Sequence, residues 1–294
     1  MKVGYPCINL SFDCRASRTF RLKSYSTEKL IETVSGNLDC LEKMVDYNIN
    51  HNLLFLRITS DLIPFASHKV NQLDWQGEFK DRFLEIGKKI KEADMRITMH
   101  PGQYTVLNSD KEEVFKKAVE EIIYHVDVLD LLGLDKRAKI NIHVGGVYGD
   151  KKAGMSRFID RYKGLDQRVK DRLIIENDEK SYSVSDCLKI SDETGIPVTF
   201  DNLHHKINNN GEDLKSLLKK VFKTWKEGDG PPVVHYSSQK PEEREGRHVD
   251  HINEKHFRKF LTDMKGFNFD LILEIKDKEK SAQKALKIIK KYEG

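Results

Sequence analysis

Residues 172–201 read RLIIENDEKSYSVSDCLKISDETGIPVTFD, and this stretch contains the repeating unit that decides the fold. A short apolar run ends in Glu176, a longer stretch with helical spacing follows, and a second short apolar run ends in Asp201. Gly195 stands just before the second run, where the end of a helix favours left-handed backbone. The stretch therefore predicts a strand, a helix and a second strand.

The same alternation extends along the whole chain. Each predicted strand is followed by a stretch with helical spacing, and the strands are Lys2–Ile8, Leu53–Thr59, Arg96–His100, Lys139–Gly145, Arg172–Glu176, Pro197–Asp201, Pro231–Tyr236 and Phe269–Lys276. Eight strands that alternate with eight helices predict an α/β fold, a (β/α)₈ TIM barrel, as one domain over residues 1–294. The alternative is an open doubly wound sheet, which is disfavoured because no Gly-x-Gly-x-x-Gly follows the first strand.

The composition limits the class of protein only broadly. A formal net charge of +4 is weakly basic, so a DNA partner would require basic residues concentrated on one face. The first residues lack the apolar core of an export signal, and no apolar run reaches the roughly 18 residues of a membrane span. Cys7, Cys14, Cys40 and Cys187 show no Cys-x-x-Cys spacing, so we expect four reduced thiols. We expect a cytoplasmic protein without a membrane association.

Side chains that bind metals gather at the carboxyl ends of the predicted strands 3 to 8. They are His100, His143, Glu176, Asp201, His204, His235, His248 and Glu274. In a barrel these strand ends meet at one rim, which is where active sites lie. Imidazoles and carboxylates packed together repel one another or stay unsatisfied without cations. Eight ligands exceed what one ion takes, so the sequence predicts two or three divalent ions.

Strand parity supports this clustering. Side chains alternate between the two faces of a strand, so His143 shares its face with Asn141 while the isoleucines between and before them face the helices. Asp201 likewise shares a face with Thr199. The mixed ligands suit Mn²⁺, Zn²⁺ or Fe²⁺ better than Mg²⁺ or Ca²⁺. Clustered divalent ions can activate a water and stabilise both oxygens of a phosphoryl displacement, so we expect hydrolysis of a phosphodiester.

Nine segments together resemble the UV damage endonuclease family, and they cover nearly the whole chain in order. They are GYPCINL at 4–10, LRITSDLIPFASH at 56–68, MHPGQY at 99–104, NIHVGG at 141–146, IEND at 175–178, FDNLHH at 200–205, VHYSS at 234–238, HVDHI at 248–252 and LEIKDKE at 273–279. The resemblance implies a barrel related to endonuclease IV. It also implies that the protein nicks duplex DNA immediately 5′ to a UV photoproduct and leaves a 3′-hydroxyl and a 5′-phosphate.

The resemblance also implies roles for individual residues. The metal ligands fall on the eight residues named above, with Mn²⁺ as the expected ion and Zn²⁺ or Co²⁺ as alternatives. Glu176, His235 and His143 are the expected catalytic residues, and we expect Glu176 to contact or bridge the ions and polarise the attacking water. Lesion probing falls on Gln103 and Tyr104, while Tyr5, Asn9 and His68 are implied around the scissile phosphate or the flipped nucleotides. The expected partner is double-stranded DNA with UV lesions, bound by a monomer.

One position departs from the family pattern. The family commonly has a lysine two residues before the histidine of strand 7, in some members carboxylated, and here that position is Val233. We therefore expect at least two ions to bind, with the ion nearest His235 held more weakly. Three other functions remain open: an apurinic-site endonuclease of the endonuclease IV type, a sugar isomerase of the xylose isomerase type, and a damage-binding protein that does not cut.

Overall fold

A computed structural model, which describes residues 1–293, shows a closed barrel of parallel strands. The order around the barrel is the order in the chain, and β1 pairs with β8 to close it. The strands are β1 (Val3–Pro6), β2 (Phe55–Ile58), β3 (Arg96–Met99), β4 (Lys139–His143), β5 (Leu173–Glu176), β6 (Val198–Asp201), β7 (Val233–Tyr236) and β8 (Asp270–Leu273). The predicted TIM barrel is confirmed, and the open sheet is excluded because the sheet has no edge strand.

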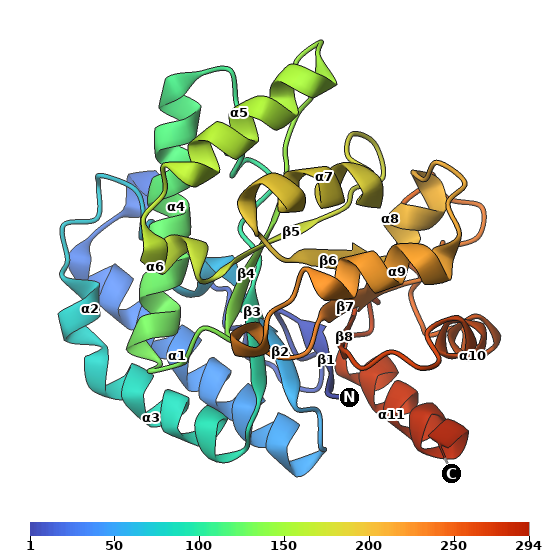
Figure 1. Ribbon diagram of the computed structural model, residues 1–294. Coiled ribbons are helices and arrows are strands. Elements are labelled where there is room, and N and C mark those ends of the chain that lie inside the picture. The colour runs from blue at the N-terminus through green and yellow to red at the C-terminus, as the bar shows by residue number, and fades with distance from the viewer. Residues whose placement is uncertain (294) are drawn as a thin grey trace.

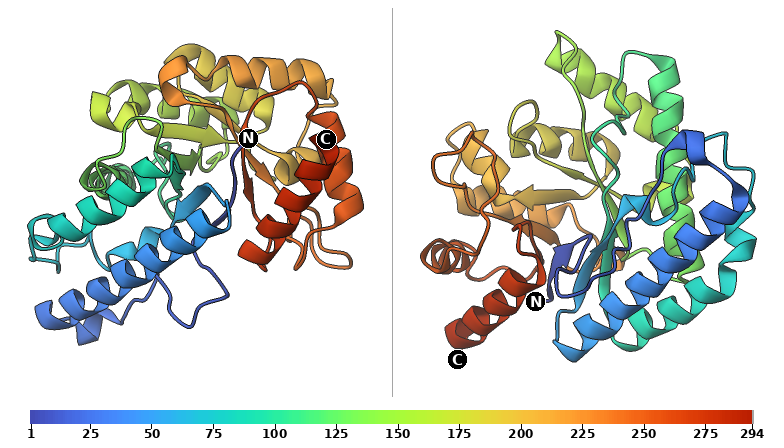
Figure 2. Two further views of the ribbon diagram at one scale, coloured as in Figure 1. Left: turned by 90° about the horizontal axis from the view of Figure 1, so that it is seen from below. Right: turned by 180° about the vertical axis from the view of Figure 1, so that it is seen from behind.

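Helices follow the strands and surround the barrel, as Figures 1 and 2 show. The longer ones are α1 (Thr27–Asn50), α3 (Lys80–Glu92), α4 (Glu112–Leu131), α5 (Lys151–Lys163), α7 (Val184–Thr194), α9 (Leu214–Lys223), α10 (Glu254–Asp263) and α11 (Glu279–Glu293). Short helices lie in the connections: α2 (Trp75–Glu78), α6 (Gln167–Lys170), α8 (Asn202–Ile207), and the 3₁₀ turns η1 (Leu22–Ser24), η2 (Ser60–Leu62) and η3 (Glu227–Asp229). Among the described residues, none of these helices has the length and apolar character needed to cross a bilayer.

The observed strands are shorter than the predicted ones at several ends. The eighth strand was expected to reach Lys276, but the ladder ends at Leu273. Glu274 still donates its backbone N–H to the carbonyl of Tyr236 at 2.8 Å, so it stays aligned with the barrel. Apolar residues continue to alternate with polar ones past the point where the strands end, so the sequence predicts strands that are too long.

The barrel interior changes from apolar to polar along the strands. Phe55, Ile174, Val233 and Ile272 form one buried cluster, to which Trp225 also belongs. Because side chains alternate, the next inward positions on the same four strands carry Arg57, Glu176, His235 and Glu274. The apolar cluster therefore forms the floor beneath a polar layer at the carboxyl rim.

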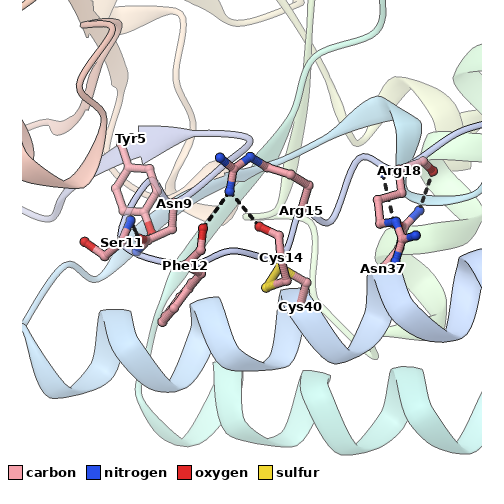
Figure 3. Close-up of a disulfide and its surroundings, with 9 residues drawn as sticks. All are labelled: Tyr5, Asn9, Ser11, Phe12, Cys14, Arg15, Arg18, Asn37 and Cys40. Carbon is pink, nitrogen blue, oxygen red and sulfur yellow. Dashed lines mark hydrogen bonds between the residues drawn. A yellow bond between two sulfur atoms is a disulfide. The ribbon is translucent and has the colours of Figure 1, made fainter.

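A disulfide between Cys14 and Cys40 corrects the expectation of four reduced thiols. Cys14 lies in the long loop between β1 and α1, and Cys40 is on the face of α1 beneath that loop (Figure 3). The two positions are 26 residues apart in the sequence, so no short spacing revealed the pairing. Cys7 and Cys187 are the free cysteines among the described residues. The disulfide ties the first loop of the carboxyl rim to α1.

Candidate metal centre

The barrel brings all eight predicted ligands to its carboxyl rim. Six come from positions at or next to the ends of strands β3 to β8, one from each strand. His204 lies in α8, which begins directly after Asp201, and its backbone N–H is capped by Asp201 Oδ1 at 2.7 Å. His248 lies in the loop after β7, where an antiparallel bridge to Gln239 fixes the backbone. Strand ends, one short helix and one loop therefore suffice to build the cluster.

Glu176 stands at the centre of this cluster and is almost fully buried. Its Oε1 lies 3.0 Å from His235 Nδ1 and 3.5 Å from His204 Nδ1. Its Oε2 lies 3.5 Å from His100 Nε2, on the opposite side of the carboxylate. The two oxygens of Glu176 thus face different histidines.

Two sets of side chains have the spacing needed to hold an ion. The first is His100, His143 and Glu176, and the second is Glu176, Asp201 and His235; within each set the ligand atoms lie within 4.8 Å of one another. Glu176 belongs to both sets. Glu176 would therefore be shared if both sets held an ion, and clustered divalent ions supply an activated water and charge neutralisation for phosphodiester hydrolysis.

The remaining predicted ligands lie at the edge of the two sets. His204 Nδ1 is 3.7 Å from Asp201 Oδ1, and His248 Nδ1 is 3.8 Å from Glu274 Oε2. The rings of His204 and His248 are neighbours, with centroids 6.4 Å apart. Glu179, which the sequence did not indicate, places Oε2 at 3.7 Å from His204 Nε2.

Buried polar atoms without partners show that these residues fit cations. His143 Nδ1 and Asp201 Oδ2 are buried and have no hydrogen-bond partner within the described protein. Buried polar groups in folded proteins are almost always satisfied, so two unpartnered atoms in one cluster leave room for a partner that the protein does not supply. Imidazole nitrogen and carboxylate oxygen are donors for Mn²⁺, Zn²⁺ or Co²⁺. The cluster therefore has the chemistry of a divalent-metal centre.

The electrostatics of the cluster also favour cations. Burial alone would raise the pKa of Glu176, but His235 and the hydrogen bond from His100 outweigh it and hold the pKa well below its usual range. Burial opposes protonation of His204, yet Asp201 and Glu176 raise its pKa to about 11. A cation bound by His204 would have to displace this proton, and the carboxylate charge that raises the pKa of His204 would also attract the cation.

Arg57 is a buried member of the site that the sequence analysis did not predict. It is only 5% exposed, and Nη1 lies 2.6 Å from Glu274 Oε1. Its Nη2 lies 2.9 Å from His235 Nε2. The signal that could have indicated it is parity, because Arg57 follows the inward-facing Phe55 by two residues on β2.

Val233 lies inside the barrel, as its parity with His235 predicts. It is fully buried and packs with Phe55 and Ile272 in the apolar cluster beneath the polar layer. A charged side chain at this position would have to lie among apolar neighbours. The position therefore supplies no ligand to the metal centre.

Two of the residues expected to probe lesions are freely accessible. Gln103 is exposed, and Tyr104, with 83% of its surface accessible, is the most exposed of the large hydrophobic side chains in the described chain. Both follow Pro101 and Gly102 in the loop after His100. His68 is also exposed, and its Nδ1 accepts a hydrogen bond from the backbone of Val70 at 3.0 Å.

Tyr5 and Asn9, which were expected around the scissile phosphate or the flipped nucleotides, are buried beneath the first loop in this structure. Tyr5 is fully buried and Asn9 is 2% exposed. The Tyr5 hydroxyl donates to Asn48 Oδ1 at 2.8 Å and accepts from Asn9 Nδ2 at 2.9 Å (Figure 3 shows the Tyr5–Asn9 pair). Asn9 Oδ1 in turn accepts from the backbone N–H of Ser11 at 2.8 Å. These hydrogen bonds tie the first loop to α1, and contact of the two residues with DNA stays a prediction.

Comparisons with known proteins agree with this geometry. A family model described as UV-endonuclease UvdE matches residues 1–294. A UV DNA damage endonuclease from Clostridium perfringens (strain 13 / Type A) is 43% identical over 292 residues, which is 99% of this chain and 71% of that protein. One from Bacillus cereus (strain G9842) is 33% identical over 289 residues, 95% of this chain and 91% of that protein.

Solved structures give the same result at the level of the fold. The crystal structure of SacUVDE superposes with a TM-score of 0.95 at 45% identity and covers 100% of this chain and 99% of that chain. D-psicose 3-epimerase from Clostridium cellulolyticum H10 has a TM-score of 0.56 at 13% identity, covers 85% of this chain and 92% of that chain, and shares the fold alone. The barrel, the residues at its rim and these matches together place the chain in the UvdE family of UV-endonucleases.

Proposed function

We propose that this protein is a metal-dependent DNA repair endonuclease that nicks duplex DNA immediately 5′ to UV photoproducts and leaves a 3′-hydroxyl and a 5′-phosphate. The observation that carries the proposal is the pair of ligand sets joined by Glu176, in a chain that matches the UvdE family along its length. Related proteins named UV DNA damage endonuclease support the choice of substrate. The protein acts as one domain and as a monomer.

The residues of the rim are proposed to have different roles in catalysis. His100 and His143 with Glu176 would hold one divalent ion, and Asp201 and His235 with Glu176 would hold a second. When bound, such ions supply an activated water and neutralise charge on the phosphodiester. Glu176 keeps its carboxylate ionised, since the histidines around it lower its pKa, and so it can orient a water by accepting its proton in a hydrogen bond. His204, His248 and Glu274 complete the proposed ligands, and Mn²⁺ is the proposed ion.

The loop after β3 is proposed to recognise the lesion. A crosslinked dinucleotide stacks poorly, so removing it from the stack costs less than unstacking an intact step. Tyr104 and Gln103 are exposed and lie next to the ligand His100, so they can fill the emptied gap while the scissile phosphate lies at the metal centre. His68 is proposed to contact the DNA from the loop after β2.

Two other functions compete with this proposal, one of them enzymatic and the other limited to binding. An apurinic-site endonuclease could use the same metal chemistry, and a damage-binding protein could use the same exposed loop without cutting. The decisive experiment incubates the purified protein and Mn²⁺ with undamaged, UV-irradiated and abasic duplexes. We expect nicking on the 5′ side of photoproducts. Cleavage of the abasic duplex alone, or binding to UV-irradiated duplex without cleavage, would establish a competing function instead.

The cellular setting follows from the substrate. We propose a cytoplasmic location, which fits an enzyme that repairs DNA. The net charge of +4 gives little general attraction to DNA, so affinity for damaged duplex should depend mainly on lesion contacts. Binding to undamaged duplex should therefore be weak and strongly dependent on salt.

A further inference from the structure

Arg57 holds a permanent positive charge beside two of the proposed metal ligands. An arginine side chain does not lose its proton in proteins. Burial alone would lower the pKa of Arg57, but the carboxylates of Glu274 and Glu176 more than compensate and raise it. The Nε atom of Arg57 has no partner, and the terminal nitrogens face Glu274 and His235. The guanidinium is thus held by the metal centre itself.

The contact with His235 restricts how that ring can bind an ion. Arg57 Nη2 lies 2.9 Å from His235 Nε2 and 3.4 Å from Nδ1; since arginine N–H groups only donate, Nε2 at the shorter contact must present a lone pair. In a neutral imidazole the proton then resides on Nδ1, the atom that lies 3.0 Å from Glu176 Oε1. An ion bound by Nδ1 needs the lone pair at that atom. Arg57 and an ion on Nδ1 therefore compete for His235.

The two ligand sets differ in their relation to Arg57. The set of His100, His143 and Glu176 has no member in direct contact with the guanidinium among the described residues. The set of Glu176, Asp201 and His235 contains the histidine that Arg57 contacts. Glu274, which could serve this set as a further ligand, has its Oε1 paired with Arg57 Nη1 at 2.6 Å. Val233 adds no compensating negative charge beneath them.

We propose that Arg57 is a positioning residue that makes the two metal positions unequal. By holding His235 and Glu274, it lowers the affinity of one set for an ion relative to the other set. The set with lower affinity is Glu176, Asp201 and His235, and the set with higher affinity is His100, His143 and Glu176. Arg57 would have to release His235 before that ring could serve this set as a ligand. This inference rests on the metal centre of the proposed function and adds the residue that sets the order of metal loading.

The barrel offers a matched control at its opposite end. Arg96 is 4% exposed on β3, points into the same barrel and lies 3.9 Å from the carboxylate of Asp270. It is thus a buried arginine beside a carboxylate, as Arg57 is, but it contacts none of the proposed ligands. Arg96→Met should change stability without changing metal binding.

The test is calorimetric titration of the metal-free protein with Mn²⁺, with circular dichroism to confirm folding. The wild-type protein should show two binding steps. In Arg57→Met the second dissociation constant should fall by at least about tenfold, because an adjacent positive charge is gone, while the first stays within about threefold. Arg57→Gln, which has no charge but can still donate to Glu274, should behave in the same way. Arg57→Lys keeps the charge and should keep the two steps separate.

The possible outcomes distinguish this inference from the function on which it rests. An unchanged or weaker second step in folded Arg57→Met and Arg57→Gln would overturn the role of Arg57 while leaving the metal centre intact. Merged steps in Arg57→Lys would show that the charge is not the cause. Absence of Mn²⁺ binding in the wild-type protein and in Arg96→Met would instead remove the metal centre, and with it both proposals.

Discussion

Glu176 Oε1 lies 3.0 Å from His235 Nδ1, although the two residues come from strands that are not neighbours in the barrel. β6 lies between their strands and contributes Asp201 to the same layer. The curvature of the barrel thus brings the ends of β5, β6 and β7 around one point. This convergence creates the set of Glu176, Asp201 and His235, while the ends of β3 and β4 bring His100 and His143 to the same Glu176.

Replacing Glu176 with glutamine should abolish nicking while the fold is retained. The amide keeps the shape but removes the charge that both proposed ions share, so we expect a loss of at least about a hundredfold in cleavage rate. Asp270→Asn is the matched control, since Asp270 is a buried carboxylate at the opposite end of the barrel. Cleavage of UV-irradiated duplex and thermal unfolding check the result. A folded Glu176→Gln protein that cuts at the wild-type rate would refute the assignment.

Changing Gln103 and Tyr104 together to alanine should remove the preference for damaged DNA. Stacking of one base on an aromatic side chain contributes on the order of 1–3 kcal/mol, so affinity for UV-irradiated duplex should fall about tenfold or more. Neither residue is a proposed ligand, so Mn²⁺ content should not change. Tyr292→Ala, which removes an exposed tyrosine from α11, is the control. If discrimination between the two duplexes persists in the double variant, another loop reads the lesion, with His68 the next residue to test.

His125 should make the protein less stable as the pH falls from 6.5 towards 4. Burial lowers the pKa of His125 from 6.5 to about 4, so between these values the unfolded chain binds a proton that the folded protein does not. The free energy of unfolding should fall through this window by about 3 kcal/mol from this residue alone. Urea unfolding with a chelator present, at several pH values, measures the change. His125→Gln should show a smaller fall, and an identical pH profile in the two proteins would contradict the prediction.

Reducing the disulfide between Cys14 and Cys40 should destabilise the protein without preventing folding. The disulfide closes a segment with a sequence separation of 26, for which chain entropy predicts a loss of about 3 kcal/mol. Urea unfolding with and without dithiothreitol measures the difference. A protein with serine at both positions should be insensitive to dithiothreitol. Equal stability of the wild-type protein under both conditions would mean that the disulfide does not constrain the unfolded chain.

The sequence by itself determined the barrel and the members of the candidate centre. Apolar runs with period two and helical stretches with period three to four are local properties, so they can be read along the chain. The parity that placed Asn141 beneath His143 is local too, and in the structure Asn141 Nδ2 donates to Glu176 Oε2 from that inward position. Because parallel strands in a barrel all end at one rim, the ligands could be grouped without knowing any distance.

Only the tertiary structure decided how distant side chains pair with one another. Arg57 contacts His235 from 178 residues away, and nothing local to either residue indicates that contact. Cys14 meets Cys40 because α1 packs beneath the first loop. Tyr5 can be buried because its hydroxyl donates to Asn48, which also lies in α1. The division of the ligands into two sets that share Glu176 likewise depends on the curvature of the closed sheet. Local periodicity fixes which way each side chain points, whereas barrel closure and helix packing fix what it meets.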